Sequence, residues 1–302
     1  MWTILAFISA LCLGFYDISK KIALRDNRVV DVLTISVCVS ALVLSVPLFL
    51  SRLFPDAMSS SYAYVPTMDL KAHLFTLLKS VIVLSSWVFA YISLKHLPIS
   101  VVSPMQATRP MWTLIGALLI FQEHLNTYQW IGILLAIGSI FIFSFKKPAN
   151  RSTLTDNRYY ICLALAILIG ACSGLYDKYL MRQYDHNAVQ VYYTLYQAIM
   201  MLITWSIMNR KLKIKNYELR IKKIGVIVLI SLFLIVSDNV YMLALRDPDS
   251  LIAVVSTIRR GGAVIGFAYG LLFLKEPDPW RKVLCMTGIM AGLICLAIGS
   301  IY

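Results

Sequence analysis

Residues 91–123 read YISLKHLPISVVSPMQATRPMWTLIGALLIFQE and place an arginine in the middle of a stretch apolar enough to span a membrane. Residues 241–276, YMLALRDPDSLIAVVSTIRRGGAVIGFAYGLLFLKE, repeat this pattern 150 positions later. Five positions of the two stretches hold the same residue type. They are Tyr91 and Tyr241, Pro98 and Pro248, Ser100 and Ser250, Arg109 and Arg259, and Gly116 and Gly266. The chain is therefore predicted to be duplicated, with an arginine at the same membrane depth in each copy.

A second match lies near the start of each copy, where the pattern C-x-G-x-Y-D occurs at residues 12–17 and at residues 172–177. Both patterns end on an aspartate within apolar sequence. Asp17 is followed four residues later by Lys21, a spacing at which helical side chains form ion pairs. Asp177 has no cation at that spacing. An interior role is therefore more strongly indicated for Asp177 than for Asp17.

The composition predicts an all-α membrane protein. Hydrophobic residues make up 59% of the chain, charged residues 14%, and the mean hydropathy is +0.75, whereas soluble domains are about a quarter charged. Since a spanning helix needs about 20 apolar residues, we expect ten transmembrane helices, near residues 2–24, 31–50, 73–95, 98–121, 127–145, 159–181, 188–208, 222–245, 249–274 and 280–300. They divide into two five-helix repeats, residues 1–148 and 149–302. Because each repeat has five spans, an odd number, the two repeats must cross the membrane in opposite orientations. The sequence therefore predicts an inverted repeat.

The distribution of Lys and Arg predicts the orientation. With ten spans, 19 of these residues fall on one side and 5 on the other. Because cytoplasmic loops are rich in Lys and Arg, both termini are expected outside and residues 209–223 in the cytoplasm. The expected location is the cell inner membrane, as a multi-pass protein in contact with lipid.

Several function classes are disfavoured. The net charge of +13 comes from Lys and Arg beside apolar segments, so no nucleic-acid partner is expected. The six cysteines and four histidines show no metal-ligand spacing, so neither a metal nor a cofactor is expected. No set of His, Cys, Ser or carboxylates has catalytic spacing, so the protein is not expected to be an enzyme.

The matched arginines are the strongest candidate site. A charge at the bilayer centre costs about 2.5–3.5 kcal/mol and normally faces a bundle interior or a water-filled cavity. Gln106, Arg109 and Thr113 share one helical face. In the second copy Arg260 stands where the first has Pro110, a residue expected to open the helical hydrogen bonding at mid-helix. Arginine forks bind carboxylate, sulfate or phosphate, so the predicted ligand is a small anion or zwitterion.

Other polar and aromatic residues are candidates for the same site, although ordinary packing explains each as well. Asp238 lies deep in its segment and needs a partner, for which Arg259 and Arg260 are nearest in sequence. Asp17, Asp177 and Asp238 are candidates for proton binding or ion pairing. The remaining candidates for substrate contact are Gln106, Tyr16, Tyr176, Trp87 and Asn239.

Residues 97–143, LPISVVSPMQATRPMWTLIGALLIFQEHLNTYQWIGILLAIGSIFIF, resemble the EamA-like family of the drug/metabolite transporter superfamily. The resemblance rests on a small-residue helix, Pro110, the closing acid Glu123 and a glycine-spaced last helix. In the second half LKEP places Glu276 where the first has Glu123. The resemblance covers nearly the whole chain. It implies a secondary transporter with alternating access and a central cavity lined by the first, third and fourth helices of each half.

Three alternatives stay open. Many members of this family are expected to keep both termini in the cytoplasm, against the Lys and Arg count. A flippase for an anionic lipid-linked intermediate would need a similar site in a split bundle. Glycines in the last helix of each half suit either tight packing within the chain or the contact of a homodimer.

Overall fold

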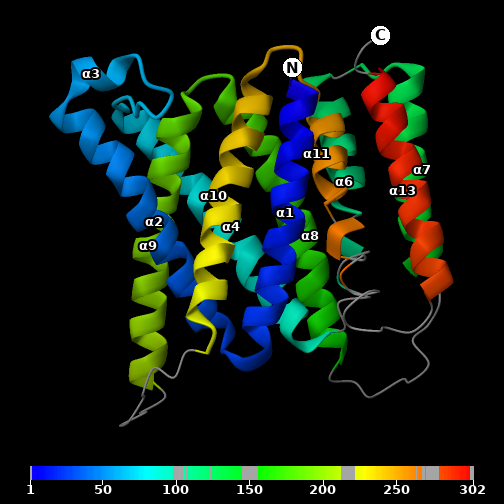
Figure 1. Ribbon diagram of the computed structural model, residues 1–302, viewed down its shortest axis with the longest axis horizontal. Helices are drawn as coiled ribbons and strands as arrows, with labels where there is room; N and C mark the ends of the chain where they lie inside the picture. The colour runs from blue at the N-terminus through cyan, green and yellow to red at the C-terminus, as the bar shows by residue number, and fades with distance from the viewer. Residues whose placement is uncertain are drawn as a thin grey trace.

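The computed structural model describes residues 2–97, 102, 105–106, 108–122, 124–144, 156–211, 222–262, 264–266, 269 and 279–299. All regular secondary structure in these residues is helical (Figure 1). The elements of the first half are α1 (Trp2–Asp26), α2 (Val29–Leu53), α3 (Pro55–Ser59), α4 (Leu70–His96), α6 (Arg109–Gly116), the π-helix η1 (Ala117–Phe121) and α7 (Thr127–Ser144). Those of the second half are α8 (Asp156–Met181), α9 (His186–Lys211), α10 (Ile224–Arg246), α11 (Ile252–Arg260) and α13 (Pro279–Gly299).

Two helix starts are fixed by aspartates that the sequence places just before an apolar run. The Asp69 side chain accepts a hydrogen bond from the backbone N–H of Ala72 at 3.0 Å, in the first turn of α4. Asp185 accepts from the N–H of Asn187 at 2.9 Å, in the first turn of α9. Each carboxylate satisfies an amide that would otherwise lack a partner at the helix start, and each favours the positive end of the helix dipole.

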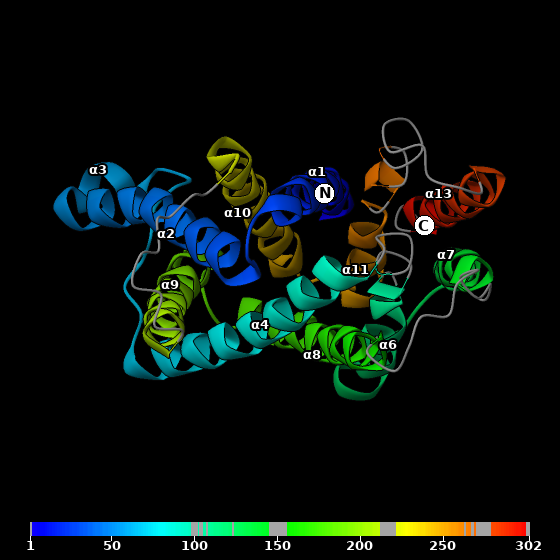
Figure 2. The same cartoon turned by 90° about the horizontal axis from the view of Figure 1, so that it is seen from below.

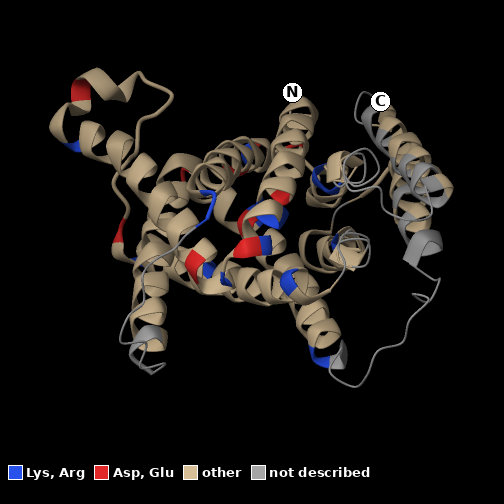
Figure 3. Ribbon diagram, turned by 60° about the horizontal axis from the view of Figure 1, so that its bottom comes forward, with Lys and Arg blue, Asp and Glu red and all other residues tan. Residues whose placement is uncertain are grey.

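Six of the described helices are long and apolar enough to cross a membrane: α1, α2, α4, α8, α9 and α10. Their outward faces carry exposed apolar side chains, such as Leu42, which is 69% exposed. Charged side chains gather instead in the middle of the bundle (Figure 3). An apolar exterior around a charged interior is the reverse of a soluble domain. The prediction of a multi-pass, all-helical membrane protein is therefore confirmed; the total of ten spans stays a prediction.

The helices form two layers that mix the two halves of the chain (Figure 2). One layer contains α1, α2 and α10, and the other α4, α8 and α9. The most extensive contacts outside the α7–α13 pair join the halves, α1 to α10 and α4 to α8. Serines hold both contacts together: the Ser9 hydroxyl donates to the Ser237 carbonyl at 2.8 Å, and Ser86 donates to the Ala166 carbonyl at 2.9 Å.

Both expected helices that carry the matched arginines, near residues 98–121 and 249–274, are interrupted. Arg109 begins α6, so Pro110 lies in the first turn, where its missing N–H costs no helical hydrogen bond. Helical residues at positions 102, 105 and 106 precede this break, so the expectation that Pro110 opens the helical hydrogen bonding in the middle of the segment agrees with the structure. In the second half α11 ends on Arg260, before a turn at Gly261 and Gly262. One arginine therefore opens a helix, and its counterpart lies at the end of one.

Two glycines of α13 pack within the chain. A Cβ at Gly288 of α13 would overlap the Ser139 side chain of α7. A Cβ at Gly299 would lie 2.9 Å from the Asn126 side chain, whose amide donates to the Gly299 carbonyl at 2.6 Å. These glycines serve the α7–α13 contact, which is the first of the two roles expected for them.

Candidate substrate-binding site

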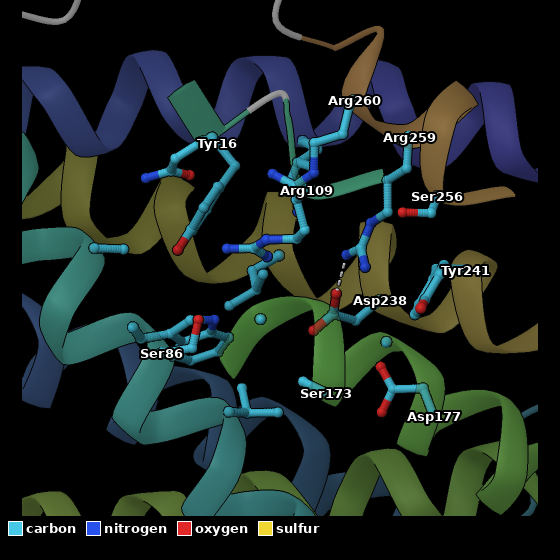
Figure 4. Close-up of a pocket in the computed structure, with 18 of the residues that line it drawn as sticks. Tyr16, Ser86, Arg109, Ser173, Asp177, Asp238, Tyr241, Ser256, Arg259 and Arg260 are labelled. Atoms are coloured by element: carbon cyan, nitrogen blue, oxygen red, sulfur yellow. Dashed lines mark hydrogen bonds and ion pairs between the residues drawn. The ribbon is translucent and has the colours of Figure 1, made fainter. Parts of the chain in front are cut away.

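A cavity of about 100 Å³ lies among the charged residues in the middle of the bundle (Figure 4). Its walls come from α1, α4 and α6 of the first half and from α8, α10 and α11 of the second. Tyr193 of α9 and Gln106, which precedes α6, complete the described lining. These helices are the set that the family resemblance implied. The cavity is large enough for several water molecules or for the polar part of a small ligand.

Arg109 extends from α6 toward α8. Its Nη2 donates to the Ala166 carbonyl at 3.2 Å, while its Nε is buried with no hydrogen-bond partner in the described chain. The guanidinium lies against Gly170, where a Cβ would overlap Cζ. Arg109 forms no ion pair among the described residues. Gly170 thus makes room for a charged group.

Arg259 is paired with Asp238 of α10, the first of the two partners that the sequence offered for this carboxylate. The guanidinium carbon lies 4.1 Å from the centroid of the Tyr241 ring. The Tyr193 hydroxyl donates to the second carboxylate oxygen of Asp238 at 2.6 Å. Asp238 is therefore held by one charged and one neutral donor, and its negative charge is largely used within the protein.

Arg260 also lines the cavity, and Figure 4 shows the three arginines converging from α6 and α11. It makes no hydrogen bond or ion pair within the part of the chain that the structure describes. Three guanidinium groups around one cavity repel one another, and the effect is strong in a medium of low dielectric constant. The site is therefore prepared for negative charge.

Asp177 of α8 is paired with Lys79 of α4, so this ion pair joins the two halves of the chain. The Lys79 side chain is only 2% exposed, and its Nζ lies 4.6 Å from the centroid of the Tyr193 ring. A buried pair of this kind is strongly destabilised when one member is removed. The sequence indicated that Asp177 needs a partner outside its own helix, and the structure supplies one from the other half.

Asp17 is paired with Lys20 at 2.7 Å, three residues on. The ion pair expected with Lys21 is corrected, because the Lys21 amine donates instead to the Leu94 carbonyl at 3.3 Å, at the end of α4. Lys20 also lies 4.5 Å from the centroid of the Tyr16 ring. The pair remains beside the cavity, which both of its members line.

The remaining candidates divide between the cavity and other places. Gln106, Trp87 and Tyr16 line the cavity, and the Tyr16 hydroxyl lies 3.2 Å from that of Tyr91. Tyr176 is outside the described lining, and its hydroxyl donates to a backbone carbonyl of α4 at 3.1 Å.

Asn239 is likewise outside the lining and belongs to a polar cluster on the other face of α10. Its amide donates to the side chains of Asn187 and Gln190 at 3.0 and 2.8 Å. Four residues from the matched motifs, Pro98, Ser100, Glu123 and Glu276, lie outside the described residues.

Two site residues were missed by reasoning from the sequence alone. Lys79 had a detectable signal, because it is a charge near the middle of a predicted spanning segment. Tyr193 had none, since tyrosines are common at membrane interfaces and its segment contains three. Its role depends on a contact with Asp238, 45 positions away.

Comparisons with known proteins agree with the fold. Residues 1–145 match the family model described as the EamA-like transporter family. A solved structure titled "Crystal structure of protein" is similar to this chain over 98% of both chains, with a TM-score of 0.74 and 9% sequence identity. At this identity the likeness concerns the fold alone. No curated protein matches the chain.

Proposed function

The first half of the chain, residues 1–145, belongs to the EamA-like transporter family, and from that premise we propose that the protein is a secondary active transporter of a small anionic or zwitterionic metabolite. The observation that carries the substrate class is the presence of Arg109 and Arg260 in the cavity without a carboxylate partner among the described residues. Unpaired cations are retained inside a membrane protein at a cost, and substrate pathways are where they are found.

We further propose that the two halves, residues 1–148 and 149–302, are inverted five-helix repeats related by an axis in the membrane plane. The proposal is supported by reciprocal packing: the first helix of each half packs on the third helix of the other, as α1 on α10 and α8 on α4. The fourth helices, α6 and α11, contact each other. Repeats of this kind rock about a central site and expose it alternately to the two sides of the membrane.

For the orientation we propose that both termini lie outside the inner membrane. Figure 1 places the start of α1 and the end of α13 at one end of the bundle, with the end of α9 and the start of α10 at the other. In the Asn216→Cys variant, the new thiol is expected to be protected in intact cells from a reagent that cannot cross the membrane, and to react after permeabilisation. Labelling in intact cells would reverse the orientation.

Transport is tested with the purified full-length protein in proteoliposomes. Uptake of a panel of radiolabelled anionic and zwitterionic metabolites is compared for the wild type, Arg109→Ala and a matched control, Arg25→Ala. Arg25 is an exposed arginine at the end of α1, outside the cavity. We expect uptake by the wild type and the control and none by Arg109→Ala. Uptake by all three proteins alike, or movement of a lipid-linked anion alone, would contradict the proposal.

A further inference from the structure

The charges that line the cavity do not balance. Five cationic side chains face three carboxylates among the described lining residues, which leaves two positive charges in excess. The cations are Lys20, Lys79, Arg109, Arg259 and Arg260, and the acids are Asp17, Asp177 and Asp238. Because water is scarce inside a membrane-spanning bundle, an excess of two charges is costly until a ligand neutralises it.

Each carboxylate already has a cation of its own. Asp17 is paired with Lys20, Asp177 with Lys79, and Asp238 with Arg259. The excess therefore resides on Arg109 and Arg260, which have no acidic partner in the described chain. No carboxylate is left over to receive the ammonium group of a zwitterion.

Hydrogen-bond donors are also left over at the cavity. The Nε atoms of Arg109 and Arg259 are buried and have no partner among the described residues, although buried donors in folded proteins nearly always have one. Arg109 stands in the first turn of α6, and the preceding Thr108 makes no side-chain cap there. The dipole of α6 adds partial positive charge at the same place. An anion that accepts hydrogen bonds would satisfy both the unpaired donors and the unpaired cations.

We propose that the substrate is a small dianion, a phosphate monoester or a dicarboxylate, held between Arg109 and Arg260. The inference rests on the proposed transport function and narrows its substrate class. Each guanidinium group presents a planar fork that fits a carboxylate or two phosphate oxygens. A dianion matches the charge excess, whereas a monoanion or a zwitterion leaves cavity charge uncompensated.

The charge of the ligand is tested with pairs of similar shape. Binding to the purified full-length protein is measured by calorimetry at pH 8, where both groups of each dianion are ionised. One pair is succinate and its monoamide, and the other is methyl phosphate and dimethyl phosphate. We expect the dianion of at least one pair to bind at least about tenfold more tightly than its monoanion, a difference of about 1.4 kcal/mol. The pair that shows the preference distinguishes a dicarboxylate from a phosphate site.

A variant links this preference to the cavity. Arg260→Gln removes one of the two excess charges and leaves no described acid without its partner. The preference for the dianion is expected to fall to about twofold or less, while Arg25→Gln, the exposed control, keeps it. Retention of the wild-type preference in Arg260→Gln would place the dianion elsewhere and overturn the proposal.

Failure of this inference is distinguishable from failure of the transport function. If the wild type binds and transports monoanions as well as dianions, the charge inference is wrong and the anion transporter stands. If neither member of any pair binds and no anion is transported, both are wrong.

Discussion

Arg109 and Arg259 occupy matched positions of a duplicated sequence, yet their surroundings differ. Arg259 is paired with Asp238 and lies over the ring of Tyr241. Arg109 donates to the Ala166 carbonyl, and its guanidinium group packs against Gly170. The aligned position 150 residues before Asp238 is Val88, so the first half has no acid at the corresponding position. The two matched positions thus both hold an arginine, while the residues around each one decide whether its charge is neutralised within the protein.

The contacts between the first helix of one half and the fourth-helix region of the other also differ between the two halves. On α8, Gly170 makes room for the movable end of the Arg109 side chain. On α1, the Ala10 carbonyl and the backbone of Gly14 lie against Gly262, beyond the end of α11. The first contact leaves a charged group able to shift, whereas the second joins backbone to backbone. The two halves therefore differ in rigidity as well as in charge.

The largest effect is expected for Arg259→Ala, which would leave Asp238 without its cation inside the bundle. Loss of one member of a buried ion pair costs about 3–5 kcal/mol, so the unfolding transition in detergent should fall steeply. Adding Asp238→Asn should restore most of the loss, because the stranded charge is then absent. A single variant as stable as the wild type would show that the ion pair does not stabilise the fold.

A smaller loss, about 1–3 kcal/mol as is typical of overpacking, is expected for Gly262→Ala. The new methyl group would overlap the Ala10 carbonyl, and backbone cannot move aside cheaply. Gly266→Ala is the control, since a Cβ there meets nothing within 4 Å. The two variants are compared by thermal unfolding. Equal stability would mean that α1 and the turn after α11 are not in close contact.

Arg109→Ala should cost less than about 1 kcal/mol of stability, because no carboxylate is left stranded, but it should abolish transport. The expected contrast is that Arg259→Ala loses mainly stability, whereas Arg109→Ala loses mainly transport. Melting curves and uptake are measured on the same preparations. A strong loss of stability in Arg109→Ala would assign this arginine a structural role instead.

The smallest effect on stability, within about 0.5 kcal/mol, is expected for Gly170→Ala. Its methyl group meets the end of a flexible side chain, which can swing into the cavity. Uptake should therefore fall without being abolished. Because Arg109→Ala itself abolishes uptake, the coupling of the two residues is measured by melting curves: in the Arg109→Ala background the glycine substitution should cost no stability, because the side chain that its methyl group meets is absent. An additive loss would show that Gly170 acts independently of Arg109.

The sequence predicted those features of the site that repeat or that carry a cost in apolar surroundings. Such features are the matched arginines, the C-x-G-x-Y-D pattern and the isolated Asp238. Arg109, Arg259 and Arg260 all line the cavity. The partner of Asp238 was also within reach, because α10 and α11 are adjacent in the chain. The same motifs carry the resemblance to a membrane transporter family, whose model matches residues 1–145.

The contacts between the two halves could not be predicted from local sequence patterns. No local pattern joins Lys79 to Asp177, which are 98 positions apart. Tyr176 and Asn239 stand beside true lining residues in the sequence, but the rotation of their helices directs them elsewhere. The helix break near Arg260 was also hidden, because apolar composition continues through it, whereas Pro110 signalled the break near Arg109.

The exchange of partners between the halves has a consequence for biosynthesis. Helix α1 is translated about 200 residues before α10, the helix with which it has its most extensive contact. Until then Ser9 has no partner from Ser237, and the charged face of α1 has no cavity to line. The first half is thus inserted into the membrane as an incomplete product, and the bundle closes only when the last third of the chain arrives.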